Sequence, residues 1–183
     1  MVGENMNMPF FFVHHGQTDW NDKGLLMGQQ DPPLNELGRL QAHVVAKRLQ
    51  SLSFATLCYS TATRAKETAL IIAENCPCSI HSNDKLKERS WGVLEGEPVN
   101  SEQLIAAENH LPFEAETKEQ FRQRVIIGME QAFLFPGPLV IVSHWGVYEV
   151  ICEQLNLKSI PFLNTEIVHY FQEFSRWRLE IFT

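Results

Sequence analysis

Phe-Phe-Phe-Val-His-His-Gly-Gln-Thr, residues 10–18, is an apolar run that ends in two histidines, a glycine and small polar residues. A short apolar run of this kind is typical of a strand buried within a parallel sheet. Open α/β sheets bind ligands at the carboxyl ends of their strands, where these polar residues fall. The stretch therefore predicts an α/β fold with an imidazole placed at a ligand site.

The rest of the chain alternates between strand-like and helix-like segments. Further strands are predicted at 55–59, 78–82 and 139–143, beside the first at 9–14, with a hairpin at 167–174 and 177–182. Helices are predicted from Asn35 to Leu49 and over 63–75, 117–135 and 146–155. In the first helix, the apolar residues expected in the core are Leu37, Leu40, Val44, Val45 and Leu49. The alternation predicts a three-layer sandwich, a mostly parallel sheet flanked by helices, in a single domain over residues 1–183.

Composition limits the function. A net charge of −7 argues against non-specific nucleic-acid binding, which depends on clustered Lys and Arg. Residues 1–8 do not have the pattern of a signal peptide and are predicted to be a loose tail. No apolar stretch is long enough for a membrane helix. The four cysteines lack metal-type spacing, which favours a reduced, cytoplasmic protein.

Three further segments add polar and charged side chains to the predicted α/β pattern. Ser60 to Ala69 opens a helix with Arg64 in its first turns, and residues 86–96 form an acidic, glycine-punctuated loop. A second apolar strand ends at Ser143-His144-Trp145-Gly146. Together with residues 10–18, these segments resemble the histidine phosphatase superfamily, also called the phosphoglycerate mutase-like family, in their order and over nearly the whole chain.

The resemblance implies a role for each matching residue. His15 would become phosphorylated, Glu88 would act as general acid and then base, and Arg64 and His144 would bind the phosphoryl group. Phosphoryl transfer needs such a nucleophile, proton donor and positive charge, so these residue types also suit the chemistry by themselves. The family pattern adds Asn21 and Gly28 near the substrate phosphate, and it implies no metal and no cofactor. Glu95 and Glu97 are rival acids to Glu88.

His14 departs from the family pattern, which has arginine before the nucleophile. Histidine is charged only below its pKa of about 6.5, whereas arginine is always charged. If His14 faces the phosphate, phosphate binding should strengthen as pH falls, and we expect a narrow bell-shaped rate profile on the acidic side of neutrality.

Three functions remain open at this stage. A phosphomonoesterase acting on a small phosphorylated metabolite is favoured over a mutase, because the segment 97–116 is a short cap and a mutase must shield its phosphohistidine from water. A phosphate-binding protein that has lost turnover is the main alternative. A zinc site of His14, His15 and His144 is a third, although no known ligand spacing supports it.

Overall fold

A computed structural model describes residues 6, 8–100, 102, 104–106 and 114–182. The described chain folds around a six-stranded sheet of order β3-β2-β4-β1-β5-β6. The strands β3, β2, β4 and β1 run parallel to one another. The hairpin β5–β6 completes the sheet beside β1, with β5 antiparallel to both β1 and β6. The strands are β1 (Phe10–His14), β2 (Thr56–Ser60), β3 (Ser79–Asn83), β4 (Leu139–Ser143), β5 (Ile167–Glu173) and β6 (Arg176–Phe182). The predicted mostly parallel α/β sheet and its edge hairpin are confirmed.

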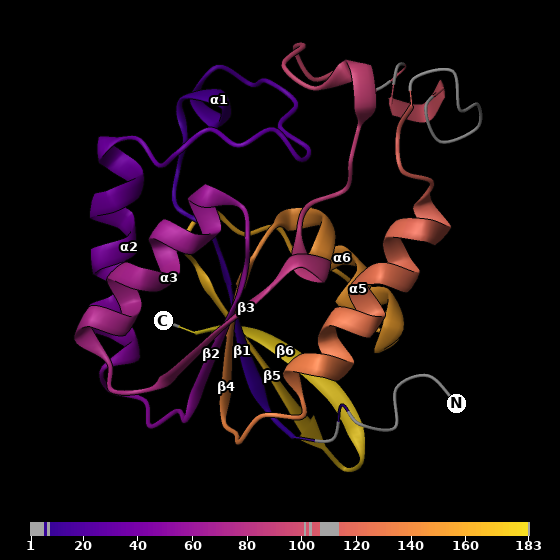
Figure 1. Cartoon of the computed structure of the whole chain (residues 1–183). Coiled ribbons are helices and arrows are strands. Elements are labelled where there is room, and N and C mark those ends of the chain that lie inside the picture. Colours follow the sequence, from indigo (N-terminus) through magenta and orange to yellow (C-terminus); the bar gives the residue numbers. More distant parts are fainter. Residues whose placement is uncertain (1–5, 7, 101, 103, 107–113, 183) are drawn as a thin grey trace.

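Helices cover both faces of this sheet. Figure 1 shows α2 and α3 together on one side and α5 and α6 on the other, which gives three layers. None of the described helices has the length and apolar character needed to cross a membrane. The helices are α1 (Asp19–Asp22), α2 (Glu36–Leu49), α3 (Thr63–Asn75), α5 (Lys118–Ala132) and α6 (Trp145–Gln154), with 3-10 turns at η1 (Asp84–Leu86) and η2 (Gly92–Leu94).

The strand β1 supplies both halves of the core. Successive residues of a strand point to opposite faces, so Phe10 and Phe12 pack on the α5–α6 side while Phe11 and Val13 pack on the α2–α3 side. Phe10 stacks on Tyr170 of β5 with ring centroids 4.5 Å apart. Burial on both faces explains why this strand reads as an unbroken apolar run rather than an alternating one.

The α2 helix corrects one expectation. Leu37, Leu40 and Val44 are 49%, 63% and 55% exposed, although the sequence pattern placed them in the core. The buried face is instead formed by small residues and by the end of the predicted stripe: Gly38, Ala42, Val45, Ala46 and Leu49. Small side chains let α2 lie close to its neighbours, and Gly38 is required because a Cβ there would overlap the backbone of Gln17. Three of the five expected core residues therefore lie on the outer face.

The expected loose tail is wrong for Met6 and Met8. Met6 is buried in the core cluster on the α5–α6 side, and Met8 packs against the same cluster. A side chain at Gly137 would overlap the Met8 sulfur, so this contact is close. Residues 1–5 and 7 lie outside the described residues.

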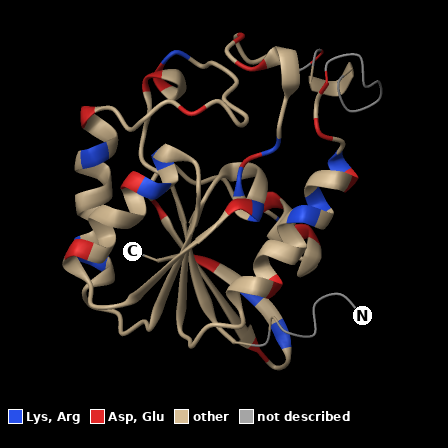
Figure 2. Cartoon of the chain, viewed as in Figure 1, with Lys and Arg blue, Asp and Glu red and all other residues tan. Residues whose placement is uncertain are grey.

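The four parallel strands of the sheet contain no charged side chains. Among the described residues, β1, β2, β3 and β4 contain no Lys, Arg, Asp or Glu. Figure 2 shows these strands in tan, with the charged residues on the helices and loops and on the edge hairpin β5–β6. Charged groups at the carboxyl ends of the strands must therefore come from the segments that follow each strand.

Candidate active site

A cavity of about 640 Å³ opens at the carboxyl end of β1. Its lining also comes from the loop after α1, the start of α3, the loop before η2, and the helices α5 and α6. This position at the end of parallel strands is the usual ligand site of an open α/β sheet. The sequence-predicted residues that line it are His14, His15, Asn21, Gly28, Arg64 and Glu88.

His15 is held by segments that lie far away in the chain. Its backbone N–H donates to the Ser143 carbonyl at 3.1 Å, and its carbonyl accepts from the Asn164 side-chain amide at 2.8 Å. The next residue, Gly16, donates its N–H to the Thr68 hydroxyl at 3.0 Å. A side chain at Gly16 would overlap the Gly38 carbonyl, which is why glycine must follow the histidine here.

The protonation state of His15 follows from its two partners. Nε2 lies 3.1 Å from Nε of Arg64, and a guanidinium N–H can only donate, so Nε2 accepts. The proton therefore resides on Nδ1, which donates to the Gly16 carbonyl at 2.8 Å. Burial, and then the electrostatic interactions with His14 and Arg64, hold the pKa of His15 well below 6.5. His15 is thus a neutral imidazole whose Nε2 lone pair is available for attack on an electrophile.

Arg64 lies in the first turn of α3 with its side chain almost fully buried. Its other two nitrogens donate to the carbonyls of Gln30 and Gly28, each at 2.9 Å. Burial lowers its pKa, while the charges of Glu88, Asp31 and Glu95 act in the opposite direction. The guanidinium is therefore a fixed cation beside Nε2 of His15.

Glu88 is a buried carboxyl on the facing wall of the cavity. Its oxygens accept backbone N–H groups from Arg89 at 2.8 Å and from Gly146 at 3.1 Å. Burial raises its pKa, more than these two hydrogen bonds and the charge of Arg64 lower it, and the charge of Glu149 raises it further. A carboxyl whose pKa is raised keeps its proton to higher pH than usual, which suits a proton donor.

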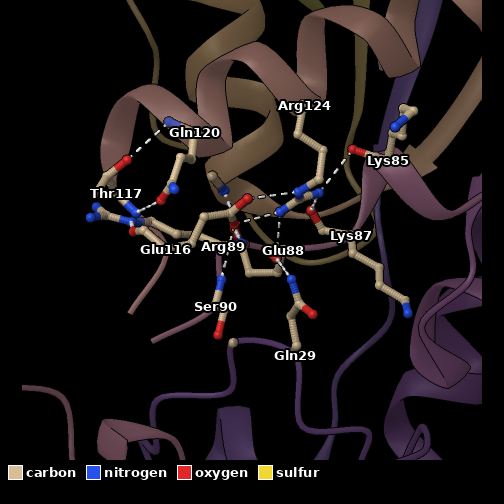
Figure 3. Close-up of polar contacts among 12 residues, drawn as sticks. Gln29, Lys85, Lys87, Glu88, Arg89, Ser90, Glu116, Thr117, Gln120 and Arg124 are labelled. Atoms are coloured by element: carbon tan, nitrogen blue, oxygen red, sulfur yellow. Dashed lines mark hydrogen bonds and ion pairs between the residues drawn. The ribbon is translucent and has the colours of Figure 1, made fainter. Parts of the chain in front are cut away.

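An ion pair fixes the loop that carries Glu88. Arg124 of α5 forms a two-point contact with the Glu116 carboxylate at 2.7 and 2.8 Å. The same guanidinium donates to the carbonyls of Lys85, Lys87 and Glu88 at 2.9 to 3.2 Å. Figure 3 shows Arg124 reaching from its helix to this loop. Arg124 is therefore a positioning residue for Glu88, a role that no motif in the sequence indicates.

Glu95, the rival acid, has a structural position. One of its oxygens accepts from the N–H groups of Gln29 and Trp91, and the other accepts from the N–H of Gln30, all at 2.9 to 3.0 Å. It thereby joins the loop around Gly28 to the loop after Glu88. Gly28 has a φ of 53°, and a side chain there would overlap the Glu95 carboxylate, so glycine is needed for this junction.

Asn21 also has a structural partner. Its side-chain oxygen accepts the Thr18 N–H at 3.0 Å, and the Thr18 hydroxyl accepts the Asn21 N–H at 3.2 Å, which forms the capping box of α1. Asn21 lines the cavity at the same time.

His144 lies near the nucleophile but not on the cavity wall. Its ring centroid is 5.2 Å from that of His15, it is fully buried, and it is absent from the described lining. Its Nε2 contacts the Ser60 hydroxyl at 2.7 Å, while Nδ1 has no hydrogen-bond partner among the described residues. Burial, and then the charge of Arg64, hold its pKa well below 6.5. His144 is therefore a neutral imidazole at neutral pH in the protein alone, and the phosphoryl-binding role that the resemblance implies for it stays a prediction.

His14 lines the cavity beside His15, and its ring centroid is 4.4 Å from that of His15. Burial, and then the charge of Arg64, lower its pKa from 6.5 to about 3. In the protein alone, His14 is therefore neutral from weakly acidic to neutral pH, well below the ordinary pKa of 6.5 used in the sequence-based expectation. Stronger phosphate binding at lower pH and the bell-shaped rate profile require a bound phosphate to raise this pKa, and they stay predictions.

Most of the outer part of the cavity was not predicted from the sequence. Trp145, which directly follows His144 and suggested a narrowed pocket, does line the cavity. Phe121, Glu149 and Val150 of α5 and α6 were not anticipated, and Glu149 lies one helical turn after Trp145. That turn follows directly after the second histidine strand, so helical spacing from Trp145 was the available signal. Among the described residues, no group of three or more His, Cys, Asp or Glu is arranged to hold a metal ion, so the zinc alternative gains no geometric support.

With this geometry, the chain belongs to branch 1 of the histidine phosphatase superfamily, whose family model matches residues 10–180. Among its relatives, a probable phosphoglycerate mutase, GpmB, of Yersinia enterocolitica is 37% identical over 120 residues, which is 66% of this chain and 50% of that protein. The chain spans about half the length of the curated relatives it matches.

Solved structures share the fold over nearly the whole chain. Mycobacterial hydrolase 1 has a TM-score of 0.81 at 23% identity and covers 94% of this chain and 96% of its own. A mycobacterial glucosyl-3-phosphoglycerate phosphatase, solved with VO3, has a TM-score of 0.79 at 23% identity, with 96% and 98% covered. These likenesses confirm the phosphoglycerate mutase-like fold expected from the sequence.

Proposed function

We propose that the protein is a phosphomonoester hydrolase that acts on a small phosphorylated substrate through a phosphohistidine on His15. The observation that carries the proposal is the contact between Arg64 and Nε2 of His15, which makes that nitrogen an acceptor and therefore the attacking atom. Glu88, in the same cavity, has the raised pKa that a proton donor needs. Nucleophile, cation and acid are thus supported by independent features.

The reaction has two balanced steps. Nε2 attacks phosphorus, the bond from phosphorus to the ester oxygen breaks, and the Glu88 carboxyl gives its proton to the leaving oxygen. Water then attacks phosphorus, the N–P bond breaks, and the Glu88 carboxylate takes the proton from water while phosphate leaves. When substrate binds, the hydrogen bond that Arg64 Nε–H donates to Nε2 of His15 must be broken, and the same N–H then donates to a phosphoryl oxygen. The charge of Arg64 stabilises the equatorial oxygens.

Hydrolysis of an aryl phosphate and of metabolite phosphates in EDTA, from about pH 5 to 8, a range that spans histidine titration, tests the proposal. His15→Ala should abolish turnover, and His43→Ala, at an exposed position on α2, should not. Quenching in alkali during turnover should trap phosphate on His15 by mass spectrometry. Turnover that survives in His15→Ala would reject the phosphohistidine route.

A phosphate-binding protein without turnover is the second candidate. The neutral His14 favours it, because a permanent positive charge expected from the family motif is missing beside the nucleophile. Orthovanadate or phosphate that binds to a protein without hydrolytic activity would support this reading. A mutase, as in the name of the Yersinia relative, would instead move phosphate between two positions of its substrate without release.

A further inference from the structure

We propose that the substrate's leaving group is uncharged and largely apolar, held in the outer part of the active-site cavity. This inference rests on the proposed function for its chemistry. It names a substrate class that excludes small carboxylates such as phosphoglycerate. Three features of the cavity wall carry it.

The first feature is a division of the cavity into a polar floor and an apolar outer wall. His15, Arg64 and Glu88 gather where β1 ends. The rest of the lining has a large apolar part, which includes Leu25, Trp91, Val99, Ile105, Phe121 and Trp145. Its charged members, Arg89, Lys118, Glu149 and Glu153, are considered with the third feature. Ligand cavities of about 300 to 1,000 Å³ bury most of a small organic molecule, so a volume of about 640 Å³ leaves room for more than a phosphate.

The second feature is that apolar side chains at this wall remain open to solvent. Val99 and Ile105 are 57% and 58% exposed, although both line the cavity. Val99 is held in place because its N–H donates to the Gly24 carbonyl at 3.0 Å, and the preceding residue, Pro98, forms an isolated β-bridge with Leu25. An apolar leaving group would cover these side chains, and removing apolar surface from water is favourable.

The third feature is the charge of the outer wall. Glu149 and Glu153 both line the cavity, and the charge of Glu149 acts on Glu88. The nearby cations are already engaged: Lys118 pairs with Glu153 at 3.0 Å. Arg89 donates to the Glu116 carbonyl at 2.8 Å and lies over the Trp91 ring at 4.3 Å. A substrate carboxylate would meet Glu149 and would have to displace Glu153 from Lys118, so it is disfavoured.

Linear alkyl phosphates test the apolar requirement, because their leaving-group chemistry is nearly constant while their length changes. A fully buried methylene is worth about a fourfold change in affinity. We expect kcat/KM to rise at least about tenfold from ethyl to hexyl phosphate, since burial at an open cavity mouth is partial. Pentyl phosphate should exceed 4-phosphonooxybutanoate, its carboxylate counterpart, by at least about tenfold.

Two variants connect these ratios to the wall. Val99→Ser should reduce the hexyl-to-ethyl ratio, whereas Val44→Ser, at a valine of similar exposure on α2 outside the described lining, should leave it unchanged. Glu153→Gln removes one anionic partner of Lys118 and should raise the relative rate of the carboxylate ester.

Binding of ethyl- and hexylphosphonate by calorimetry separates this inference from the proposed function. Tighter binding of hexylphosphonate by a protein that hydrolyses no ester would uphold the apolar pocket and reject the hydrolase. Equal binding and equal kcat/KM along the series, or a preference for the carboxylate ester, would overturn the inference even if turnover is rapid.

Discussion

Nε of Arg64 lies 3.1 Å from Nε2 of His15, and this contact assigns the imidazole proton to Nδ1. Both side chains are buried, so neither can exchange its partner for water at little cost. The same N–H that marks the nucleophilic nitrogen must be released when a phosphoryl group arrives. The first prediction follows from this double role.

Arg64→Gln should lower kcat by at least about a hundredfold, the usual loss when a donor to a developing charge is removed. It should also raise the pKa of His15, because the charge of Arg64 is one of the causes that hold it down. NMR titration of the imidazole and steady-state kinetics measure both effects. Arg48→Gln, at an exposed residue of α2, serves as the control. An unchanged kcat would show that Arg64 does not face the phosphoryl group.

The raised pKa of Glu88 leads to a prediction for the pH dependence of the rate. A raised pKa keeps the carboxyl protonated to higher pH than usual, and the rate should fall as pH rises through that pKa. Glu88→Gln should remove this limb and slow alkyl esters about 10² to 10⁴-fold, but slow 4-nitrophenyl phosphate much less, since nitrophenolate leaves without a proton. Glu97→Gln, at the exposed second rival, should change neither. Equal slowing of both esters would argue against an acid role.

His14→Arg should bind phosphate about tenfold more tightly at neutral pH, because it places a permanent charge where the present side chain is neutral. Competition by inorganic phosphate during turnover, or calorimetry, gives the affinity. His43→Arg adds the same charge at a distant exposed position and should have no effect on affinity. Failure of the first variant to gain affinity would mean that residue 14 does not face the anion.

Arg124→Ala should reduce both stability and kcat. Removing one partner of the half-buried pair leaves Glu116 uncompensated, at a cost of about 2 to 3 kcal/mol in the free energy of unfolding. The high-pH limb due to Glu88 should shift, which a purely structural role elsewhere would not produce. Arg122→Ala, on the same helix, breaks a surface pair with Glu119 at 3.6 Å and a hydrogen bond to the Gln154 side chain at 3.2 Å, and should cost under about 1 kcal/mol. Urea titration and the pH–rate profile check both.

Stability should fall as pH falls below 6.5. A histidine with a folded pKa of about 3 binds a proton far more readily when unfolded, so the unfolded state gains protons first. Between pH 7 and 5, His14 accounts for about 2 kcal/mol of this loss. Glu88 acts with the opposite sign because its folded pKa is raised. The test compares how much the free energy of unfolding falls between about pH 7 and 5 in the native protein and in His14→Gln. The loss should be smaller in His14→Gln, and an equal loss would contradict the low pKa of His14.

The sequence predicts the sheet well because its signals are local. Each of these signals involves only a few neighbouring residues: the apolar runs, the Thr117–Gln120 capping box and the turn of the edge hairpin. Motif order likewise places His15, Arg64 and Glu88 in one cavity. The exposed face of α2 was misread, because residues such as Leu40 fit a helical stripe as well as the small residues that are buried.

What the sequence does not provide is the electrostatic state of the site. Whether His14 and His144 carry charge depends on burial and on Arg64, which comes from another part of the chain. Arg124 and Glu95 likewise acquire their importance from backbone groups that reach them only after folding. These contacts cannot be predicted from residue type and spacing.

The contacts that anchor His15 affect the order in which the parts of the chain come together during folding. The amide that holds its carbonyl belongs to Asn164, 149 residues further along the chain, and both sheet neighbours of β1 come from the last third of the sequence. Long-range contacts of this kind form late, because the intervening chain must first be closed. During synthesis, His15 is therefore made well before the segments that hold it, and it reaches its position only after they have been added. A chain that lacks those segments would carry the histidine without its anchors.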